Sequence, residues 1–185
     1  MTEAYIISGF LGSGKTTLIK TIINTAFKGK KIAVIENDFG EARIDASLLE
    51  KYDLKVNSLT EGCICCSLVG DFGKALEKVI AEFHPDRILI EPSGVGKLSD
   101  VIKAVQGVAE ETGLVLNSYT TVVDAKKCKM YMRNFGEFFD NQVEYAGAII
   151  MSRTDIIDEK KAQQISALCK KLGVHTKEIQ TKDAD

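Results

Sequence analysis

Hydrophobic residues along the chain follow two patterns that alternate. Short apolar runs bounded by turn-forming or charged residues predict strands over residues 5–8, 32–35, 87–90, 121–123 and 148–151. Between these runs, apolar residues recur at helical spacing, which predicts helices within residues 18–26, 72–83, 98–105 and 162–172. Strands that are apolar on both faces and alternate with amphipathic helices indicate an α/β fold, with a mainly parallel sheet flanked by helices on both faces.

The composition is typical of a single globular domain. The 185 residues are 45% hydrophobic and 27% charged, a balance that can form a sizeable buried core. Proline occurs only twice, and no segment resembles a flexible linker between domains. We therefore expect residues 1–185 to form one domain.

The distribution of charge argues against two classes of partner. Lys and Arg number 24 against 26 Asp and Glu, which gives a formal net charge of -2, and the lysines occur in small sets separated by acids. Binding to nucleic acid or to an anionic membrane requires a denser basic face. No apolar run is long enough to span a bilayer, and the first residues do not form a signal peptide. We therefore expect no nucleic acid and no membrane as a partner.

Cysteine usage indicates a reducing compartment. The chain has five cysteines, an odd number, and Cys63, Cys65 and Cys66 lie within four positions. A disulfide framework spreads its cysteines so that they join distant loops, and this crowding is not typical of one. We therefore expect a cytoplasmic protein whose thiols are free for chemistry.

A glycine-rich segment follows the first predicted strand. Residues 9–17, GFLGSGKTT, fit the pattern G-x-x-x-x-G-K-[ST], whose glycines let backbone N–H groups turn inward toward phosphates. The following helix adds its positive N-terminal end. Lys15 would neutralise β- and γ-phosphate oxygens, and the Thr16 hydroxyl would bind Mg²⁺, whereas a turn without a ligand needs neither. The predicted nucleoside triphosphate site comprises Gly9, Gly12, Ser13, Gly14, Lys15, Thr16 and Thr17.

The thiol cluster at residues 63–66 predicts a site for a transition metal. Zn²⁺ takes four N, S or O ligands in a tetrahedron, so at least one ligand must come from another part of the chain. Glu36 and Glu41 follow the second predicted strand and are the best-placed candidates, although solvated acids in a polar loop explain them equally well. Co²⁺ and Ni²⁺ accept the same mixed ligands as Zn²⁺. Buried structural cysteines and an oxidised redox pair are the alternatives for the thiols.

Four motifs taken in order resemble one family. The phosphate loop, then ENDFGE at residues 36–41, CICC at 63–66 and EPSG at 91–94 resemble the CobW-type metallochaperone GTPases, relatives of the nickel-delivery GTPases for urease and hydrogenase. The resemblance covers nearly the whole chain and implies a P-loop domain with a largely parallel sheet. Family members often pair as homodimers, and many continue into a C-terminal domain that is absent from these residues.

The resemblance also implies roles for residues outside the phosphate loop. Glu91, directly after the strand over residues 87–90, would reach Mg²⁺ through water, and Gly94 would let the backbone approach the γ-phosphate. Asp45 resembles the first switch acid of the family, which contacts Mg²⁺ or the attacking water; an exposed surface acid is the alternative. The expected catalytic residues are therefore Lys15, Asp45 and Glu91.

Residues 152–155, SRTD, follow the last predicted strand, where the family usually has N-K-x-D. Asp155 would accept hydrogen bonds from guanine N1 and N2, whereas adenine would leave this carboxylate unpaired. Ser152 replaces the usual Asn, and Arg153 replaces the usual Lys and can lie over the base with its planar face. A helix cap is the alternative role for Asp155. Asp124 also matches a family position, but we assign it no chemistry.

Together, the residues and the resemblance favour Mg²⁺-dependent GTP hydrolysis coupled to binding and delivery of a transition metal, Zn²⁺ or else Co²⁺ or Ni²⁺, to a client metalloprotein or cofactor pathway. Segments near a γ-phosphate become ordered by it and relax after hydrolysis, so a metal held there would change its coordination. Two alternatives stay open. One is a small-molecule kinase with a structural zinc site, which would need a basic lid. The other is a non-enzymatic metal sensor or scaffold with a bound nucleotide.

Overall fold

The computed structural model describes residues 1–36, 69–172 and 177–180, and these contain one six-stranded sheet. The strands are β1 (Glu3–Ser8), β2 (Ile32–Glu36), β3 (Arg87–Glu91), β4 (Val115–Asp124), β5 (Ala148–Ser152) and β6 (Lys177–Gln180). Their order across the sheet is β2-β3-β1-β4-β5-β6, and every neighbouring pair is parallel. The predicted parallel α/β architecture is confirmed.

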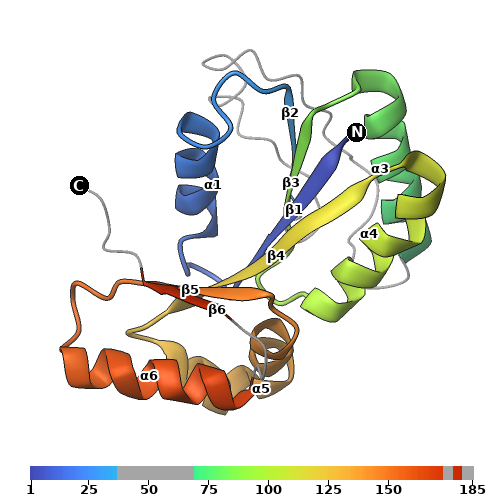
Figure 1. The fold of residues 1–185 in the computed structure, drawn as a ribbon. Coiled ribbons are helices and arrows are strands. Elements are labelled where there is room, and N and C mark those ends of the chain that lie inside the picture. Colours follow the sequence, from blue (N-terminus) through green and yellow to red (C-terminus); the bar gives the residue numbers. More distant parts are fainter. Residues whose placement is uncertain (37–68, 173–176, 181–185) are drawn as a thin grey trace.

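Helices cover both faces of this sheet, as the strand pattern predicts. They are α1 (Lys15–Asn24), α3 (Val69–Phe83), α4 (Leu98–Thr112), α5 (Cys128–Glu144) and α6 (Glu159–Leu172). Figure 1 shows α1 on one side of β1 and β3, with α3 and α4 on the other side and with α5 and α6 beside β5 and β6. The chain therefore forms a three-layer sandwich of helices, sheet and helices.

Alternate residues of β1, β2, β3 and β4 enter two separate cores. On β1, Ile6 packs in the larger core under α3, α4, α5 and α6, whereas Ile7 packs against Ile19 and Ile23 of α1. Ile6 and Ile19 are fully buried, and such burial stabilises the fold by about 1.5–3 kcal/mol for each side chain. Because both faces of the sheet are covered, the strands carry continuous apolar runs rather than alternating ones.

Two elements and part of a third were missing from the sequence-based prediction. Helix α5 kinks at Phe135, whose backbone is non-helical (φ -139, ψ 32), and its Gln142 is polar although fully buried, so its apolar spacing is irregular. Strand β6 has only four residues. Strand β4 begins at Val115, earlier than predicted, because its first half pairs with β1 although it includes Asn117 and Ser118 and is only partly buried.

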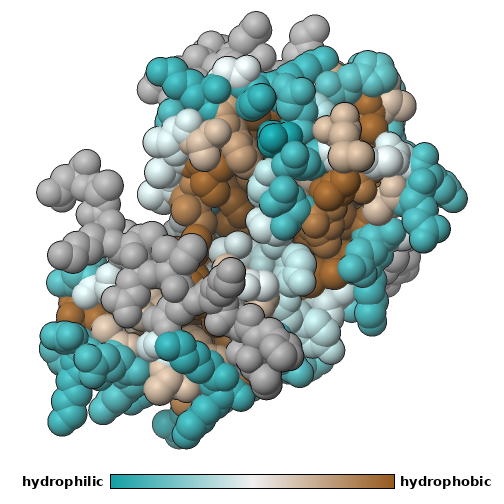
Figure 2. Space-filling model, viewed as in Figure 1, coloured by the Kyte–Doolittle hydropathy of each residue, from teal (hydrophilic) through white to brown (hydrophobic). Residues whose placement is uncertain are grey.

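The face of the molecule shown in Figure 2 carries both hydrophilic and apolar residues. On the face shown in Figure 2, hydrophilic residues cover the outward sides of the helices, and apolar residues show between them. None of the helices in the described ranges combines the length and the apolar character that crossing a membrane requires.

The parallel topology brings the ends of five strands to one edge of the sheet. Ser8, Glu36, Glu91, Asp124 and Ser152 are the last residues of β1, β2, β3, β4 and β5. In register, Glu36 lies opposite Glu91, and Asp124 lies opposite Ser152. Ligands of open α/β sheets bind outside the carboxyl ends of the strands, so this edge is where a site is expected.

Candidate functional site

The loop between β1 and α1 has the backbone that its glycines predict. Gly9, Gly12 and Gly14 have φ angles of +146°, +68° and +101°, a region that L side chains rarely adopt. A Cβ atom on Gly9 would also lie 2.4 Å from the carbonyl oxygen of Val122. Gly14 is the N-cap of α1, so the loop leads directly into the positive end of that helix.

Two buried hydroxyls lie at the start of this loop and within it. The Ser8 and Ser13 hydroxyls are buried, and neither has a hydrogen-bond partner in the described part of the chain. Buried hydroxyls normally find a partner, and one without it is the kind of group that an absent ligand or water satisfies. Thr17, which is also predicted to bind the nucleotide, is exposed on the first turn of α1, so its hydroxyl can contact water. The loop therefore has unused hydrogen-bonding capacity where phosphates are predicted to bind.

Lys15, Thr16 and Glu91 converge beside this loop. The Lys15 Nζ atom lies 3.7 Å from Glu91 Oε1, and the Thr16 hydroxyl oxygen lies 3.2 and 3.3 Å from the two Glu91 carboxylate oxygens. The side chains of Lys15 and Glu91 are only 8% and 13% exposed, so water screens their attraction weakly. The hydroxyl and carboxylate oxygens are hard donors, the type that Mg²⁺ prefers. This donor set fits the predicted magnesium site.

The loop that follows Glu91 packs directly on the phosphate loop. A Cβ atom on Gly94 would lie 2.8 Å from the backbone nitrogen of Leu11 and 2.7 Å from its Cδ2 atom, so only glycine allows this approach. Backbone groups of Gly94 and its neighbours are therefore close to the predicted phosphate position. This placement supports the predicted role of Gly94.

The residues after β5 connect the predicted base-binding segment to the phosphate loop. The Ser152 hydroxyl donates to the carbonyl oxygen of Ser13 at 2.7 Å, and Arg153 Nη2 donates to the carbonyl oxygen of Gly12 at 3.0 Å. Arg153 also has a positive φ of 59°, which is uncommon for a residue with a side chain. These contacts fix the segment after β5 relative to the phosphate loop, and the predicted stacking of Arg153 on a base stays a prediction.

Asp124, to which the sequence analysis assigns no chemistry, lies at the candidate site. Its side chain is fully buried, and Oδ2 lies 2.6 Å from Arg153 Nη1. Its Oδ1 atom accepts hydrogen bonds from the backbone N–H groups of Lys126 and Lys127 at 2.9 and 3.1 Å. Asp124 thus orients the guanidinium that reaches the phosphate loop. The signals in the sequence were the place of this acid directly after an apolar strand and its match to a family position.

Asp155 is free to meet a ligand. Its side chain is exposed and has no hydrogen-bond partner among the residues that the structure describes. The alternative role as a helix cap is wrong, because α6 begins at Glu159 and the Asp158 carboxylate accepts from the backbone N–H of Lys161 at 2.7 Å. Recognition of guanine by Asp155 stays a prediction.

The predicted transition-metal ligands are only partly within the described residues. Glu36 is half-buried at the end of β2, beside Glu91 in register. The other predicted ligands and the predicted switch acid lie outside the described residues: Glu41, Asp45, Cys63, Cys65 and Cys66. Within residues 1–36, 69–172 and 177–180, no three His, Cys, Asp or Glu side chains are grouped closely enough to hold a metal ion. The metal site stays a prediction.

The two remaining cysteines pack in the hydrophobic core. Cys128 and Cys169 are buried thiols that form no disulfide, at the start of α5 and within α6. A hydrogen bond from Cys169 lowers the pKa of the Cys128 thiol and outweighs the opposing effect of burial. Neither thiol belongs to the predicted cluster at residues 63–66.

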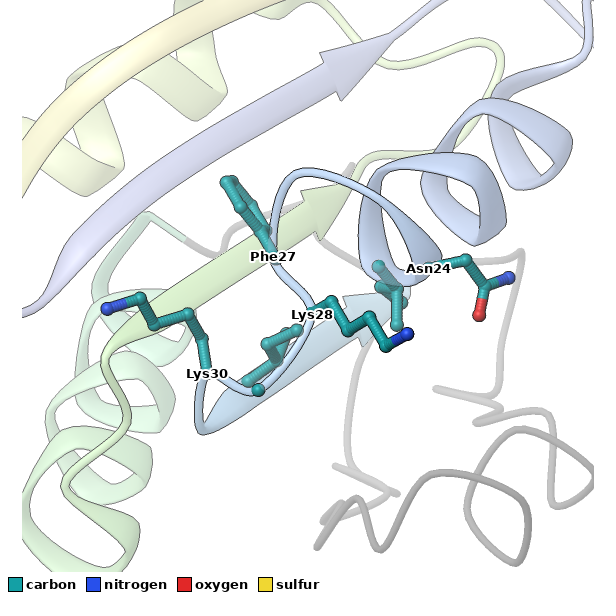
Figure 3. Close-up of a pocket in the computed structure, with 7 residues that line it drawn as sticks. Asn24, Phe27, Lys28 and Lys30 are labelled. Atoms are coloured by element: carbon teal, nitrogen blue, oxygen red, sulfur yellow. The ribbon is translucent and has the colours of Figure 1, made fainter.

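A separate pocket of about 290 Å³ lies at the other end of α1. Its lining residues are Ile23, Asn24, Phe27, Lys28, Gly29, Lys30 and Ile32, which form the end of α1, the following turn and the start of β2. In Figure 3, Lys28 and Lys30 point to opposite sides of this turn. None of the predicted site residues lines this pocket, so it is distinct from the site at the carboxyl ends of the strands.

Comparison with known proteins gives a consistent result. A model of the CobW/HypB/UreG nucleotide-binding domain matches residues 3–180. The zinc chaperone YjiA of Escherichia coli is 34% identical over 162 residues, which cover 83% of this chain and 50% of YjiA. The zinc chaperone CobW of Sinorhizobium sp is 30% identical over 183 residues, which cover 84% of this chain and 51% of that protein. The chain spans about half the length of these relatives.

Solved structures share the fold. The structure of Zn(II)-bound YjiA GTPase from E. coli is similar with a TM-score of 0.67 and 26% identity, over 100% of this chain and 58% of that one. The hydrogenase maturation factor HypB from Archaeoglobus fulgidus is similar with a TM-score of 0.65 and 19% identity, over 97% of this chain and 81% of that one. At this lower identity, HypB supports the fold alone.

Proposed function

Because the chain belongs to the CobW/HypB/UreG family of nucleotide-binding domains, we propose that it hydrolyses GTP with Mg²⁺ and couples hydrolysis to delivery of a transition metal. Zinc is the first candidate for the metal, since YjiA and CobW are both named zinc chaperones, with Co²⁺ and Ni²⁺ as alternatives. The expected recipient is a client metalloprotein or a cofactor pathway. A reducing compartment such as the cytoplasm would keep the three predicted thiols available, and assembly as a homodimer stays a prediction.

One observation carries the hydrolytic part of this proposal, namely the convergence of Lys15, Thr16 and Glu91 beside a loop whose buried hydroxyls have no partner among the described residues. Mg²⁺, when bound, neutralises charge on the β- and γ-phosphates. The Thr16 hydroxyl would be its direct ligand, and the Glu91 carboxylate would act through a bound water. The Lys15 ammonium, only 8% exposed, would attract the phosphate oxygens more strongly than a solvated lysine.

Intrinsic turnover is expected to be slow, on the order of 10⁻⁴–10⁻² s⁻¹. Fast hydrolysis requires an arginine that neutralises the transition state, and two of the described arginines already bind acids: Arg87 pairs with Glu3, and Arg153 pairs with Asp124. A partner protein that supplies such a group would accelerate the reaction.

The metal-binding part of the proposal depends on position along the chain. Glu36 lies beside Glu91 in the sheet, and the segment that leaves β2 at Glu36 carries the other predicted ligands, Glu41, Cys63, Cys65 and Cys66. A γ-phosphate that orders this segment would therefore also change the geometry of the ligands. By thermodynamic reciprocity, the metal must then alter the affinity for the nucleotide.

Hydrolysis is tested by incubating the purified chain with GTP and Mg²⁺ over hours and identifying the products. We expect GDP and free phosphate as the only products, with turnover lost when EDTA removes Mg²⁺. Phosphate transferred to a small-molecule acceptor would instead support a kinase, and a protein that binds GTP without any turnover would support a sensor or scaffold. ATP in place of GTP tests the base selectivity in the same assay.

A further inference from the structure

Helix α5 contacts both loops of the nucleotide site. In its first half, the Tyr131 hydroxyl donates to the carbonyl oxygen of Leu11 in the phosphate loop at 3.2 Å. In its second half, the Gln142 amide nitrogen donates to the carbonyl oxygens of Gly94 and Gly96 at 3.0 and 2.9 Å. The two halves meet at the kink at Phe135. A single helix thus joins the phosphate loop to the loop that follows Glu91.

Gln142 is held rigidly where it makes these contacts. Its side chain is fully buried, and the Thr121 hydroxyl of β4 donates to its backbone carbonyl at 2.6 Å. Both amide hydrogens are used on the same loop, one on each side of Val95. Two hydrogen bonds to alternate carbonyls restrict the peptide planes between them, which include the Gly94 backbone that packs on Leu11.

Neighbouring contacts fix the far end of the same loop. Lys97 Nζ lies 2.7 Å from Glu137 Oε1, and Asn141 exchanges two hydrogen bonds with Ser99, at 3.2 Å to its backbone N–H and 3.1 Å to its hydroxyl. The loop is therefore anchored to α5 at its end by Glu137 and Asn141, and at its middle by Gln142. Of these contacts between α5 and the loop, those of Gln142 reach Gly94, the glycine that approaches the phosphate loop.

Burying the Gln142 amide costs free energy, and a residue that only filled space would not need a polar side chain here. Its Oε1 atom is buried without a hydrogen-bond partner in the described part of the structure. Leucine or methionine would fill a similar volume with no polar atom to bury. A buried polar group with an unsatisfied atom is more readily explained by a specific task for its donors.

We propose that Gln142 is a positioning residue for GTP hydrolysis: its two donated hydrogen bonds hold the Gly94–Gly96 backbone in the arrangement that receives the γ-phosphate. This inference rests on the proposed GTPase function. Gln142 would act through the loop without touching the nucleotide, so it would affect recognition of the γ-phosphate and leave binding of the diphosphate largely unchanged.

The test compares three variants of the full chain. Gln142→Met keeps the volume and removes both donors. Gln142→Glu keeps the shape; its ionised carboxylate has no donor, while its protonated form donates one hydrogen bond, and burial raises the pKa of such a carboxyl. Val143→Ala is the matched control, since Val143 is the next residue of α5, is fully buried in the core and makes no hydrogen bond to the loop through its side chain.

The measurements are the Kd of GDP, the Kd of a non-hydrolysable GTP analogue and the single-turnover rate normalised to GDP-binding sites. For Gln142→Met we expect a rate at least about 10-fold lower and weaker analogue binding, with GDP affinity within about threefold of the parent. The rate of Gln142→Glu relative to the parent should rise as the pH falls and the carboxyl takes up a proton. Val143→Ala should melt at a lower temperature with its rate within about twofold of the parent.

Two results would overturn the inference: a rate and an analogue-to-GDP preference in Gln142→Met equal to those of the parent, or losses in Val143→Ala that match those of Gln142→Met. Failure of the proposed function looks different, because the parent itself would then release no phosphate from GTP. In that case the role in hydrolysis falls with the proposed function, and the analogue-to-GDP preference of Gln142→Met decides whether Gln142 holds the loop for the γ-phosphate.

Discussion

The two ends of the predicted nucleotide site are built differently. At the phosphate end, backbone conformation dominates: three glycines with positive φ shape the loop, and Lys15 and Glu91 are 8% and 13% exposed beside it. At the base end, side chains from separate elements make the contacts. Asp124 from β4 holds Arg153 after β5, Arg153 is 37% exposed, and Asp155 is exposed.

This difference indicates which changes each end tolerates. A site formed by backbone N–H groups and glycines has few substitutable parts, and its lysine carries most of the charge that meets the phosphates. A site formed by paired side chains can exchange partners while keeping its position, as Ser152 and Arg153 do where the family usually has Asn and Lys. We therefore expect large losses of function from single changes at the phosphate end and graded losses at the base end.

The largest effect is expected from Lys15→Ala. Removing a buried ammonium beside the phosphates should lower the rate of GTP hydrolysis by about 10²–10³-fold, because its attraction to phosphate oxygens is not replaced by water. Phosphate release under single-turnover conditions measures this loss. Lys103→Ala, on the exposed side of α4, is the matched control and should leave the rate unchanged. Equal rates for Lys15→Ala and the parent would mean that the loop does not serve hydrolysis.

Asp155→Ala should have the next largest effect. It should change the selectivity of the protein for guanine over adenine nucleotides. Without the carboxylate, the affinity for GDP should fall by about 10–100-fold while that for ADP stays the same, since only guanine donates to this group. Competition binding of GDP, IDP and ADP gives the ratios. The control is Asp158→Ala, which removes the cap of α6 and should cost about 1 kcal/mol of stability without changing the ratios. Unchanged ratios in Asp155→Ala would place base recognition elsewhere.

Arg153→Ala should give an intermediate effect, with a loss of both the affinity for GDP and the stability of the fold. The change leaves the fully buried Asp124 carboxylate with backbone donors only and removes the hydrogen bond to Gly12. We expect a loss of about 1–2 kcal/mol in the free energy of unfolding and about 10-fold weaker binding of GDP. Denaturant unfolding measures the free energy of unfolding, and titration calorimetry measures the affinity for GDP. Arg153→Lys keeps the charge but cannot reach both partners with a planar group, so it should recover only part of either loss.

The smallest effect is expected away from both ends, at Asp140 of α5. Burial and the nearby Glu144 carboxylate raise the pKa of Asp140. A raised pKa in the folded state means that the folded protein binds this proton more tightly than the unfolded chain, so its contribution to stability declines as the pH rises through the ordinary range for aspartate. Asp140→Asn should therefore stabilise the protein at neutral pH by roughly 0.5 kcal/mol and flatten this dependence. The measurement is the Tm of the parent and of Asp140→Asn at pH 4 and pH 7. A difference in Tm between the two proteins that is the same at both pH values would contradict this prediction.

Most of the phosphate end could be predicted from the sequence because its information is local. The residues from Gly9 to Thr16 are contiguous, and their backbone requirements depend on glycine itself rather than on distant partners. The five predicted strands are likewise short, apolar and buried on both faces, which made them recognisable without knowledge of their neighbours.

The parts that could not be predicted depend on contacts between distant elements. The role of Asp124 exists only because β4 and β5 are neighbours in the sheet, which places it opposite Ser152 and next to Arg153. Helix α5 was missed because Gln142, a polar residue, occupies a buried position and Phe135 interrupts the helical geometry. The pattern of hydrophobic residues does not reveal a position where a polar side chain is buried and makes hydrogen bonds.

The central claim is that nucleotide state and metal binding are coupled, and equilibrium titration tests it most directly. Zn²⁺ is titrated anaerobically into the chain loaded with Mg²⁺ and either GDP or a non-hydrolysable GTP analogue, with Cys65→Ser as the test variant and Cys169→Ser as the control thiol outside the cluster. We predict Zn²⁺ affinities that differ by at least about fivefold between the two nucleotides, a difference lost in Cys65→Ser and kept in Cys169→Ser. Identical Zn²⁺ affinities with the two nucleotides would contradict the claim.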